Sequence, residues 1–495
     1  MNILVATSEA VPFAKTGGLG DVSGALPIAL AELGEQVSVI MPAFRSVKTC
    51  GEPIESTGID LEISLGKKTV RGTLLKGRLP LSQVPVYFVE QDDYFDRPEL
   101  YGEDGKDYED NCERFVFFSR AVLEAIRLLN LKVDLLHAND WQTGLLPAYL
   151  KTELAGVPPY EQIATLFTVH NLAYQGNFWH WDMLLTGLDW KYFNWHQMEF
   201  HGNLNFMKTG LAFADAINTV SPRYAEEIQS SPLGCGLEGI LQHRREALSG
   251  IINGVSYDLW NPETDSHLAE NYGPETAEAG KAACKAALQK EMGLPVEAGV
   301  PLLGFVGRLA EQKGIDLIAG VMQQWVESSD AQWVLLGTGE AKYHELFEQM
   351  AERYPSKVAA QLAFSNPLAH RIEAGSDVFL MPSRYEPCGL NQLYSLKFGT
   401  IPVVRATGGL ADTIVNATDA TLASGEANGF CFHEYSQLAL SEALTRTLAA
   451  FADKPTWNQL VQNAMQQDWS WSRSAKQYVQ LYQRTIERVK QEVCM

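Results

Sequence analysis

The chain alternates between short runs of β-branched residues and longer stretches with helical periodicity, in both of its halves. This alternation is typical of βαβ units, in which crossover helices join parallel strands. In the first half it predicts strands at 3–6 and 37–41 with a helix at 22–33 between them. In the second half it predicts strands at 302–306 and 378–381. The sequence therefore predicts an α/β fold built from two doubly wound units.

The length of the chain agrees with this division. A chain of 495 residues is too long for one ordinary hydrophobic core, so two domains are expected. The turn signal Asn253-Gly254 and the breaker Asn261-Pro262 lie between the two alternating halves. We therefore expect an N-terminal domain over 1–250, a connector over 251–262 and a C-terminal domain over 263–471.

Charge and composition narrow the class of ligand. The formal net charge is −21, which disfavours nucleic acid as a partner because nucleic-acid binding needs a basic footprint. A neutral polysaccharide is compatible with this charge, although an acidic chain is most simply a soluble one. No run approaches the ~20 apolar residues of a membrane helix, and no signal peptide is visible. The seven cysteines are scattered and form no CxxC pair, so we expect free thiols and a cytoplasmic location.

A glycine-rich turn follows the first predicted strand, with the sequence Lys15-Thr16-Gly17-Gly18-Leu19-Gly20-Asp21. Paired glycines allow a ligand to approach the backbone, and the helix that follows presents free N–H groups. The turn is neither a dinucleotide-binding GxGxxG nor a P-loop. Spacing alone leaves two interpretations open, a tight structural turn with a solvated lysine and an anion site.

Two further loops follow predicted strands of the second half. The loop from Gly307 to Gly314 carries Arg308 and Lys313, a planar fork and a point charge that suit a diphosphate. The loop from Ser383 to Leu390 carries Glu386, which either faces a sugar or is a carboxylate at a helix start. An ordinary basic loop is the alternative for the first segment. For Cys388, a small packed residue is favoured over a nucleophile.

Polar residues also end two strands of the first half. His170 ends the strand predicted at 164–170 and Asn171 follows it, and Asp140 follows the strand predicted at 133–137. Asp140 is either a helix N-cap or a sugar ligand. The histidines show no metal-ligand spacing and the aspartates show no tight pair, so no metal and no cofactor are expected.

Together these segments resemble the bacterial and plant glycogen and starch synthases, the retaining ADP-glucose-dependent enzymes of glycosyltransferase family 5. The resemblance covers essentially the whole chain. It rests on the following segments, in this order: the Lys15 turn, His137-Ala138-Asn139-Asp140-Trp141, 168–176, Asn253-Gly254-Val255, the Arg308 and Lys313 loop, Glu386-Pro387-Cys388-Gly389-Leu390 and 399–413.

The resemblance implies a GT-B fold, in which two Rossmann-like domains face each other across a deep cleft. A helix at 472–495 would complete the N-terminal domain. The implied activity is that of an ADP-glucose:α-1,4-glucan 4-α-glucosyltransferase, which adds glucose to the non-reducing end of glycogen or a maltooligosaccharide and releases ADP. Family members retain the anomeric configuration, by front-side attack of the acceptor. The implied partners are this donor and this acceptor, with no membrane.

The resemblance also assigns roles to individual residues. Its catalytic set is Glu386, Arg308, Lys313 and His170. Lys15 and Gly18 would lie against the donor phosphates, beside the amides of Gly389 and Leu390. The other implied substrate-binding residues are Asp21, Asp140, Trp141, Asn171, Asn253, Phe364, Cys388, Asn391, Thr407 and Gly408.

Three positions depart from the family pattern. Asn391 replaces a threonine, Phe364 replaces the tyrosine that is usual against adenine, and Gln142 replaces a histidine that is frequent in relatives. Stacking on the base would survive at Phe364 without the hydroxyl. The alternatives are a GT-B transferase with UDP-glucose or another acceptor, and a weakly active glucan-binding homologue. A phosphorylase is disfavoured because the chain is short and has no recognisable pyridoxal-phosphate lysine motif.

Overall fold

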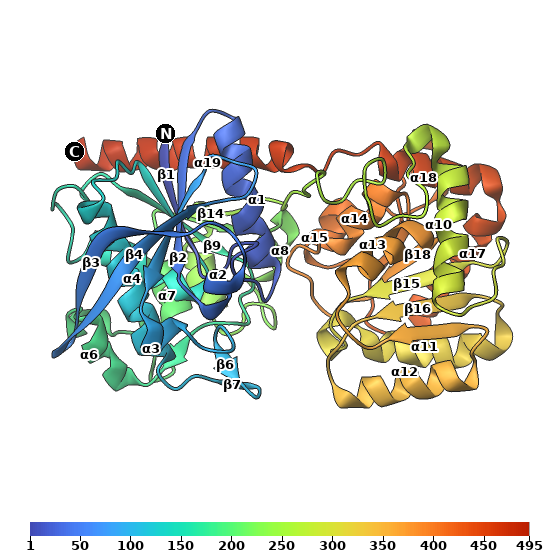
Figure 1. Ribbon diagram of the computed structural model, residues 1–495, viewed down its shortest axis with the longest axis horizontal. Coiled ribbons are helices and arrows are strands. Elements are labelled where there is room, and N and C mark those ends of the chain that lie inside the picture. The colour runs from blue at the N-terminus through green and yellow to red at the C-terminus, as the bar shows by residue number, and fades with distance from the viewer. Residues whose placement is uncertain (495) are drawn as a thin grey trace. The chain divides into compact units, whose positions relative to one another are not determined.

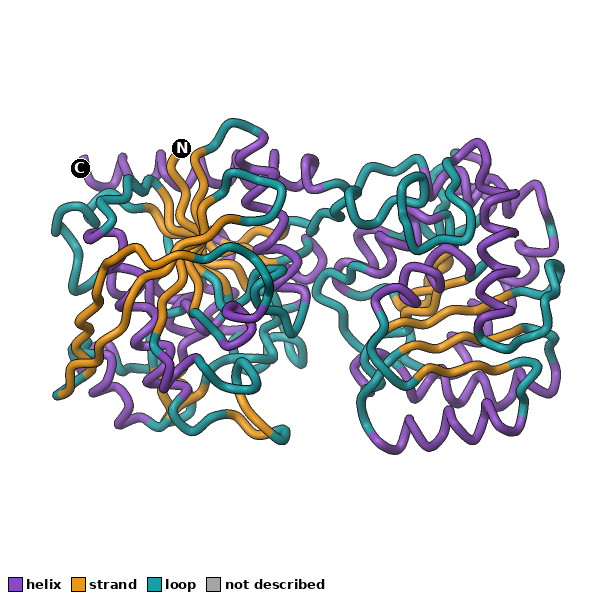
Figure 2. Tube along the Cα trace, viewed as in Figure 1, coloured by secondary structure: helices purple, strands orange, loops and turns teal. Residues whose placement is uncertain are grey.

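Two parallel-sheet units make up the computed structural model, which describes residues 1–494 and their side chains up to residue 491 (Figure 1). Unit 1 comprises Met1–Gly254 and the C-terminal segment from Trp471, and unit 2 comprises Val255–Ser470. Strands and helices alternate through most of both units (Figure 2). Met495, the last residue of the predicted 472–495 helix, lies outside the described residues.

The central sheet of unit 1 has the strand order β14-β13-β9-β8-β1-β2-β5-β4-β3. The strands from β14 to β5 are parallel, and β4 and β3 extend the sheet as an antiparallel hairpin. The strands of this sheet are β1 (Asn2–Ala6), β2 (Gln36–Pro42), β3 (Glu55–Leu65), β4 (Lys68–Arg78), β5 (Pro85–Glu90), β8 (Leu135–Asn139), β9 (Ala164–Val169), β13 (Ala216–Thr219) and β14 (Leu248–Gly250).

Helices connect these strands, and two small sheets lie outside the main one. The small strands are β6 (Gly102–Glu103), β7 (Lys106–Asp107), β10 (Asn177–Phe178), β11 (Glu199–Phe200) and β12 (Asn203–Asn205). The helices of unit 1 are α1 (Gly18–Glu32), α2 (Arg45–Thr49), α3 (Asp92–Phe95), α4 (Asn111–Leu128), α5 (Leu145–Lys151), α6 (Met183–Thr186), α7 (Phe206–Phe213), α8 (Pro222–Glu227), α9 (Glu238–His243) and α19 (Trp471–Cys494), with short 3₁₀ turns η1 (Trp141–Thr143), η2 (His180–Asp182), η3 (Trp190–Tyr192) and η4 (Arg245–Ala247).

Unit 2 has an all-parallel sheet of order β17-β16-β15-β18-β19-β20. Its strands are β15 (Leu302–Val306), β16 (Gln332–Leu336), β17 (Val358–Gln361), β18 (Val378–Met381), β19 (Ile401–Arg405) and β20 (Phe430–Phe432). Its helices are α10 (Ala277–Glu291), α11 (Ile315–Ser328), α12 (Ala341–Arg353), α13 (Asn366–Gly375), α14 (Asn391–Phe398), α15 (Gly408–Thr413), α16 (Asp419–Ser424), α17 (Gln437–Ala452) and α18 (Lys454–Met465), with 3₁₀ turns η5 (Pro274–Thr276) and η6 (Glu311–Lys313).

Most predicted elements agree with the structure, and the differences have local causes. The strands predicted at 302–306 and 378–381 are confirmed residue for residue. α1 begins at Gly18, four residues before the predicted start, because the glycine turn leads straight into the helix. The Asn253-Gly254 turn prediction is wrong, since these residues form no turn. A Cβ at Gly254 would lie 2.5 Å from Cα of Trp471, so this glycine serves close packing.

The order of the strands determines where ligands are expected in each unit. In a doubly wound sheet the ligand lies at the carboxyl ends of the strands, where the strand order reverses. In unit 1 the order reverses at β1, whose neighbours are β2 and β8. In unit 2 it reverses at β15, whose neighbours are β16 and β18. A ligand-binding site is therefore expected at the loops after β1, β8, β15 and β18.

The long C-terminal helix α19 packs against unit 1, along α1 and β9. Tyr482 on this helix is fully buried, and its hydroxyl lies 2.9 Å from Nδ1 of His137 in the middle of β8. Tyr478 accepts a hydrogen bond of 3.1 Å from Nδ2 of Asn218 on β13. These contacts explain why a segment that follows unit 2 in the sequence belongs to unit 1.

Candidate functional site

The loop after β1 brings two of the predicted site residues together. Nζ of Lys15 lies 2.7 Å from Oδ1 of Asp21, and both side chains are partly exposed. A Cβ added at Gly17 or Gly18 would meet no atom within 4 Å, and neither glycine has a positive φ. Packing therefore does not require glycine at these two positions, and the backbone there is open to a ligand.

A buried carboxylate that the sequence analysis missed holds this turn. The two carboxylate oxygens of Glu9 accept hydrogen bonds from the Thr16 amide at 2.6 Å, the Thr16 hydroxyl at 2.6 Å and the Gly17 amide at 3.2 Å. Glu9 also accepts a bond of 2.8 Å from the hydroxyl of Tyr101. Glu9 is almost fully buried, so these four donors are what stabilises its charge. The sequence signal for this role was a carboxylate just past the carboxyl end of the first strand.

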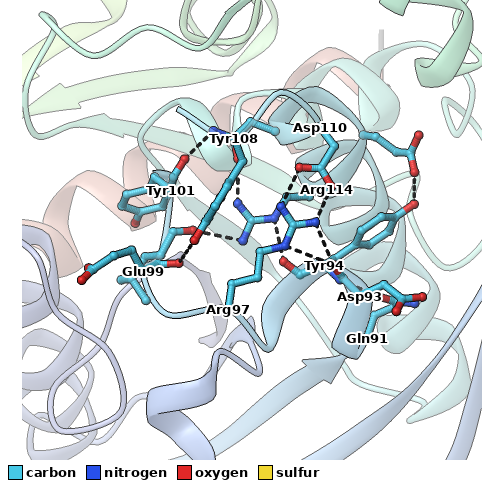
Figure 3. A network of polar contacts seen from close by, with 12 residues as sticks. Gln91, Asp93, Tyr94, Arg97, Glu99, Tyr101, Tyr108, Asp110 and Arg114 are labelled. Atoms are coloured by element: carbon cyan, nitrogen blue, oxygen red, sulfur yellow. Dashed lines mark hydrogen bonds and ion pairs between the residues drawn. The ribbon is translucent and has the colours of Figure 1, made fainter. Parts of the chain in front are cut away.

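Tyr101 is itself held by a network around a buried arginine (Figure 3). Arg114 is fully buried and donates to the carbonyls of Tyr94 at 2.7 Å and Leu100 at 3.0 Å. It also donates to Asn111, whose amide group donates to the carbonyl of Tyr101 at 2.8 Å. Burial lowers the pKa of Arg114 to about 10, so the guanidinium remains charged at neutral pH. The network fixes the backbone on both sides of Tyr101 and, through Glu9, the glycine turn.

Asp140 follows β8 in a strained conformation, with φ 55° and ψ −178°. A non-glycine residue with positive φ is uncommon and points to a local constraint. Asp140 occupies the N-cap position of η1, but its carboxylate makes no capping hydrogen bond. Instead Oδ1 accepts a bond of 2.7 Å from the backbone amide of His170. Burial raises the pKa of Asp140 to about 7, with a further increase from the Glu9 carboxylate, while the amides of His170 and Asn171 oppose it.

His170 lies beside Asp140 as a neutral, oriented ring. Its Nε2 is 2.9 Å from Oδ1 of Asn139, whose amide group donates to the Ala6 carbonyl. An amide oxygen only accepts, so Nε2 carries the proton and Nδ1 is left as an acceptor. Burial lowers the pKa of His170 to about 3. The ring can therefore bind a hydroxyl, but it does not supply a positive charge near neutral pH.

The remaining predicted residues of unit 1 differ in how open they are. Asn171 is half-buried, and its Oδ1 accepts from the Ala173 amide at 3.1 Å. Asn253 is buried, and its Oδ1 makes no hydrogen bond within the described chain, which leaves an acceptor for a ligand. Trp141 is largely buried, with its ring against Tyr101, Phe115 and Phe178. Only a small part of its ring is left exposed to a ligand.

In unit 2 the loops after β15 and β18 enclose a cavity of about 140 Å³. Nζ of Lys313 lies 2.7 Å from Oε2 of Glu386, and both line this cavity. The hydroxyl of Ser383 donates to the same oxygen at 3.0 Å. α14 begins only at Asn391, so the interpretation of Glu386 as a carboxylate at a helix start is wrong. The other lining residues are Phe305, Val306, Gly307, Leu380, Met381, Ser383, Gly389, Leu390 and Asn391.

Around this cavity the predicted residues have distinct environments. Arg308 is exposed and donates to Oε1 of Gln312 at 2.9 Å. Asn391 donates from Nδ2 to the carbonyl of Val306 at 2.7 Å, which joins the start of α14 to the end of β15. Gly389 has a φ of 74°, which a residue with a side chain rarely adopts. Cys388 is buried, as expected for a packed residue.

Thr407 and Gly408 lie beside the Glu386 loop of the cavity, and Phe364 lies in another loop of unit 2. A Cβ at Gly408 would lie 2.0 Å from the carbonyl oxygen of Glu386, so this glycine lets α15 approach the Glu386 loop. Thr407 is buried at the start of the same helix. Phe364 is 89% exposed, in the loop between β17 and α13, and its ring is accessible for stacking.

In unit 1, Gln142 is buried, and its Oε1 makes no hydrogen bond within the described chain.

The described residues contain no group of three or more His, Cys, Asp or Glu side chains able to hold a metal ion. None of their helices is long and apolar enough to cross a membrane. The six cysteines whose side chains are described are free, as predicted.

Comparisons with known proteins agree along the whole chain. The profile of the starch synthase catalytic domain matches residues 2–243, and that of glycosyl transferases group 1 matches residues 293–467. A glycogen synthase from Rhodopirellula baltica is 49% identical over 98% of both chains, and one from Syntrophotalea carbinolica is 47% identical over 98% of this chain and 99% of its own. The catalytic domain of starch synthase IV from Arabidopsis thaliana has a TM-score of 0.89 and 31% identity, over 98% of this chain and 99% of that one.

Two parallel α/β units, each with polar residues where its strand order reverses, and the match to a solved starch synthase define a glycosyltransferase of the GT-B fold. The chain belongs to the starch and glycogen synthase family. It is an enzyme that transfers glucose in glycogen or starch synthesis.

Proposed function

We propose that this enzyme transfers glucose from ADP-glucose to the non-reducing end of an α-1,4-glucan, with retention of configuration and release of ADP. The observation that carries the proposal is the Lys313–Glu386 pair in the cavity between β15 and β18. A cation and a carboxylate side by side match the two charges that develop when a glycosyl–phosphate bond breaks. The solved starch synthase IV is bound to ADP and acarbose, which supports ADP as the product here.

The donor diphosphate would be bound by Arg308 and Lys313. Arg308 can bind two phosphate oxygens at once, and Lys313 supplies a compact charge. Amides at Gly389 and Leu390 precede α14 and add partial positive charge at its N-terminus. When phosphate draws Lys313 away from Glu386, the carboxylate becomes free to face the glucose ring.

The chemical step breaks the bond between the anomeric carbon and the phosphate oxygen, and the electron pair leaves with ADP. The acceptor hydroxyl oxygen bonds to the anomeric carbon on the same face, and its proton passes to an oxygen of the departing phosphate. Glu386 stabilises the positive charge on the sugar, while Arg308 and Lys313 stabilise the negative charge on ADP. No cofactor is invoked in this step.

In unit 1, Lys15 and Gly18 would contribute to phosphate binding at the open backbone of the glycine turn. Asp140, His170, Asn171 and Asn253 would bind sugar hydroxyls. The neutral state of His170 supports a hydrogen-bonding role rather than proton transfer. Asp21 and Trp141 stay assigned to the acceptor, and Phe364, Cys388, Asn391, Thr407 and Gly408 to the donor. A cytoplasmic location stays a prediction from the sequence.

Donor competition tests the proposal. Purified enzyme is assayed for nucleotide release with ADP-, UDP- and GDP-glucose, each with glycogen and with maltooligosaccharides. We expect the highest kcat/KM with ADP-glucose and elongation of both acceptors. A higher kcat/KM with UDP-glucose would contradict the donor assignment. Glycogen binding with no release of ADP would identify a glucan-binding homologue instead.

A further inference from the structure

A group of exposed tryptophans lies in unit 1 between β9 and α7. Trp179 is 62% exposed, Trp181 50%, Trp190 38% and Trp195 70%. These are the tryptophans that are exposed in the described part of the chain, and all lie within one segment of 17 residues. Soluble proteins rarely gather large aromatic residues on the surface without a ligand or partner. None of these residues has a role in the site described above.

The rings form a connected but open array, which we call the tryptophan surface (Trp179, His180, Trp181, Trp190 and Phe193). Trp179 and Trp181 have ring centroids 6.5 Å apart with planes at 66°. Trp181 and Trp190 are 5.5 Å apart at 71°, and Trp190 and Phe193 are also 5.5 Å apart at 71°. In these edge-to-face contacts the edge of one ring lies against one face of its neighbour, and more than a third of each indole stays exposed.

The polar neighbours of this surface carry little net charge. Asp182 and Asp189 contribute two carboxylates, and Lys191, whose Nζ lies 3.8 Å from Asp189, contributes one ammonium. Residues 177–200, all described, include one lysine and no arginine, so this segment offers no basic rim of the kind that attracts an anionic lipid surface or a nucleic acid. Flat apolar faces beside carboxylates, which accept hydrogen bonds from hydroxyls, fit a neutral, amphipathic ligand with hydroxyls at its edges and C–H groups on its faces.

The surface also adjoins the candidate site along the chain. His170 directly follows β9, and the segment that carries the tryptophans starts a few residues later, at β10. The ring of Trp141 contacts that of Phe178, with centroids 5.8 Å apart, and Phe178 directly precedes Trp179. The segment that carries the tryptophans therefore packs against Trp141 of the candidate site through Phe178 of β10.

We propose that the tryptophan surface binds α-glucan chains outside the catalytic site, by stacking glucose rings on Trp179, Trp181 and Trp190. The identity of the ligand rests on the proposed function, in which the acceptor is a polymer far longer than a catalytic site. Binding there would raise the local concentration of chain ends, as a second linked contact does in multivalent binding. Short acceptors would not benefit.

The test compares the wild-type enzyme with the double variant Trp179→Ala/Trp181→Ala. Glycogen affinity is measured without donor, by electrophoretic retardation in gels that contain glycogen. We expect the dissociation constant for glycogen to rise at least tenfold and the KM for glycogen to rise with it, while kcat/KM for maltotriose changes less than twofold. Unchanged retardation of the double variant, or a wild-type enzyme that glycogen does not retard, would overturn the proposal.

Two further variants separate ring stacking from general apolar contact and from misfolding. Trp179→Tyr/Trp181→Tyr keeps aromatic faces and should keep most of the affinity, whereas Trp179→Leu/Trp181→Leu should lose it. Leu438→Ala removes another exposed apolar side chain, in unit 2, and should change nothing. Equal affinity of the Leu and Tyr variants would contradict stacking. Circular dichroism checks that each variant is folded.

Other occupants of the surface give different results. If it joins two copies of the chain, the double variant changes the mass measured by light scattering and keeps its glycogen affinity, which overturns the proposal. Co-sedimentation with neutral or anionic lipid vesicles, lost in the double variant while glycogen affinity stays, also overturns it. Absence of ADP release from ADP-glucose by the wild type would contradict the proposed function alone, because retardation by glycogen needs no turnover.

Discussion

At the scale of single residues, the ion pair between Lys313 and Glu386 is the feature most directly tied to chemistry. Its atoms are 2.7 Å apart in a small cavity, and Ser383 binds the same carboxylate oxygen. The carboxylate is nearly buried, whereas the ammonium is partly open. The lysine can therefore move toward a phosphate while Glu386 stays in place.

Replacing Lys313 by alanine should remove one of the charges that stabilise the departing ADP. We expect kcat to fall by about 100-fold or more, since removing one donor aimed at developing charge typically costs about 10²–10³ in rate. The fold should persist, because the side chain is partly exposed. Steady-state ADP release and thermal unfolding are measured side by side. Lys342→Ala, an exposed lysine of the same unit, is the control, and near-normal turnover of Lys313→Ala would refute the assigned role.

The titration of Asp140 gives a prediction about pH. Its pKa is raised from 3.8 to about 7, so between these values the folded state keeps a proton that the unfolded state has released. This group therefore stabilises the fold at low pH, and its contribution is lost as pH rises toward 7, by about 1.4 kcal/mol per pKa unit. Asp140→Asn keeps the oxygen that accepts from His170 and removes the titration.

The free energy of unfolding of wild type and Asp140→Asn is measured in urea from pH 5 to pH 8. We expect the wild type to lose stability relative to the variant as pH rises through this range. Buried neutral histidines act in the opposite direction in both proteins, because their lowered pKa values cost stability at low pH, so they cancel in the difference. A constant difference between the two proteins would show that Asp140 does not titrate there.

At the scale of elements, the turn between β1 and α1 depends on a residue outside it. Glu9 accepts hydrogen bonds from the backbone amides of Thr16 and Gly17 and from the hydroxyl of Tyr101. The Arg114 network in turn holds Tyr101 in place. The turn is thus attached to the segment between α3 and α4 as well as to its own helix. Glu9 is a positioning residue, since it acts on ligands only through the turn.

Glu9→Gln should disturb this turn without removing any ligand-binding group. The NH₂ group of glutamine would replace a carboxylate oxygen that accepts hydrogen bonds, so it would face the donors of the turn or Tyr101 and at least one bond would be lost. A lost hydrogen bond to a charged group costs about 1.5–3 kcal/mol. We expect the KM for the donor to rise about tenfold while the KM for maltotriose changes little. Hydrogen exchange of the Thr16 and Gly17 amides should become faster. Glu32→Gln, at the exposed end of α1, is the control, and unchanged exchange in Glu9→Gln would exclude the positioning role.

At the scale of the whole molecule, the chain forms two units whose membership does not follow sequence order. Tyr482 of α19 and His137 of β8 are 345 residues apart in sequence and bonded in the structure. Val255 and Ser470, the first and last residues of unit 2, form a parallel bridge. The chain thus enters and leaves unit 2 at neighbouring points, and both termini belong to unit 1.

The sequence alone predicted the elements with strong local signals. Buried parallel strands such as β15 and β18 are continuous apolar runs, so both were predicted with correct bounds. The hairpin of β3 and β4 was missed although residues 59–65 alternate apolar and polar residues, because the prediction relied on continuous apolar runs and the outer strand β3 is largely exposed. The sequence also predicted which loops carry Lys15, Asp140, His170, Arg308 and Glu386, because polar residues after buried strands have few structural reasons to be there.

Only the tertiary structure decided how these side chains are oriented and charged. That Asp140 binds the His170 amide instead of making a capping hydrogen bond, and that Glu386 pairs with Lys313, depends on which strands are neighbours in the sheet. The role of Glu9 and the exposure of the tryptophan surface also need three dimensions, because burial is a property of the packed fold. Local periodicity is encoded in neighbouring residues, and so the sequence determined the class of fold and the family. Electrostatics and hydrogen bonding join residues far apart in the chain, and so only the fold could decide them.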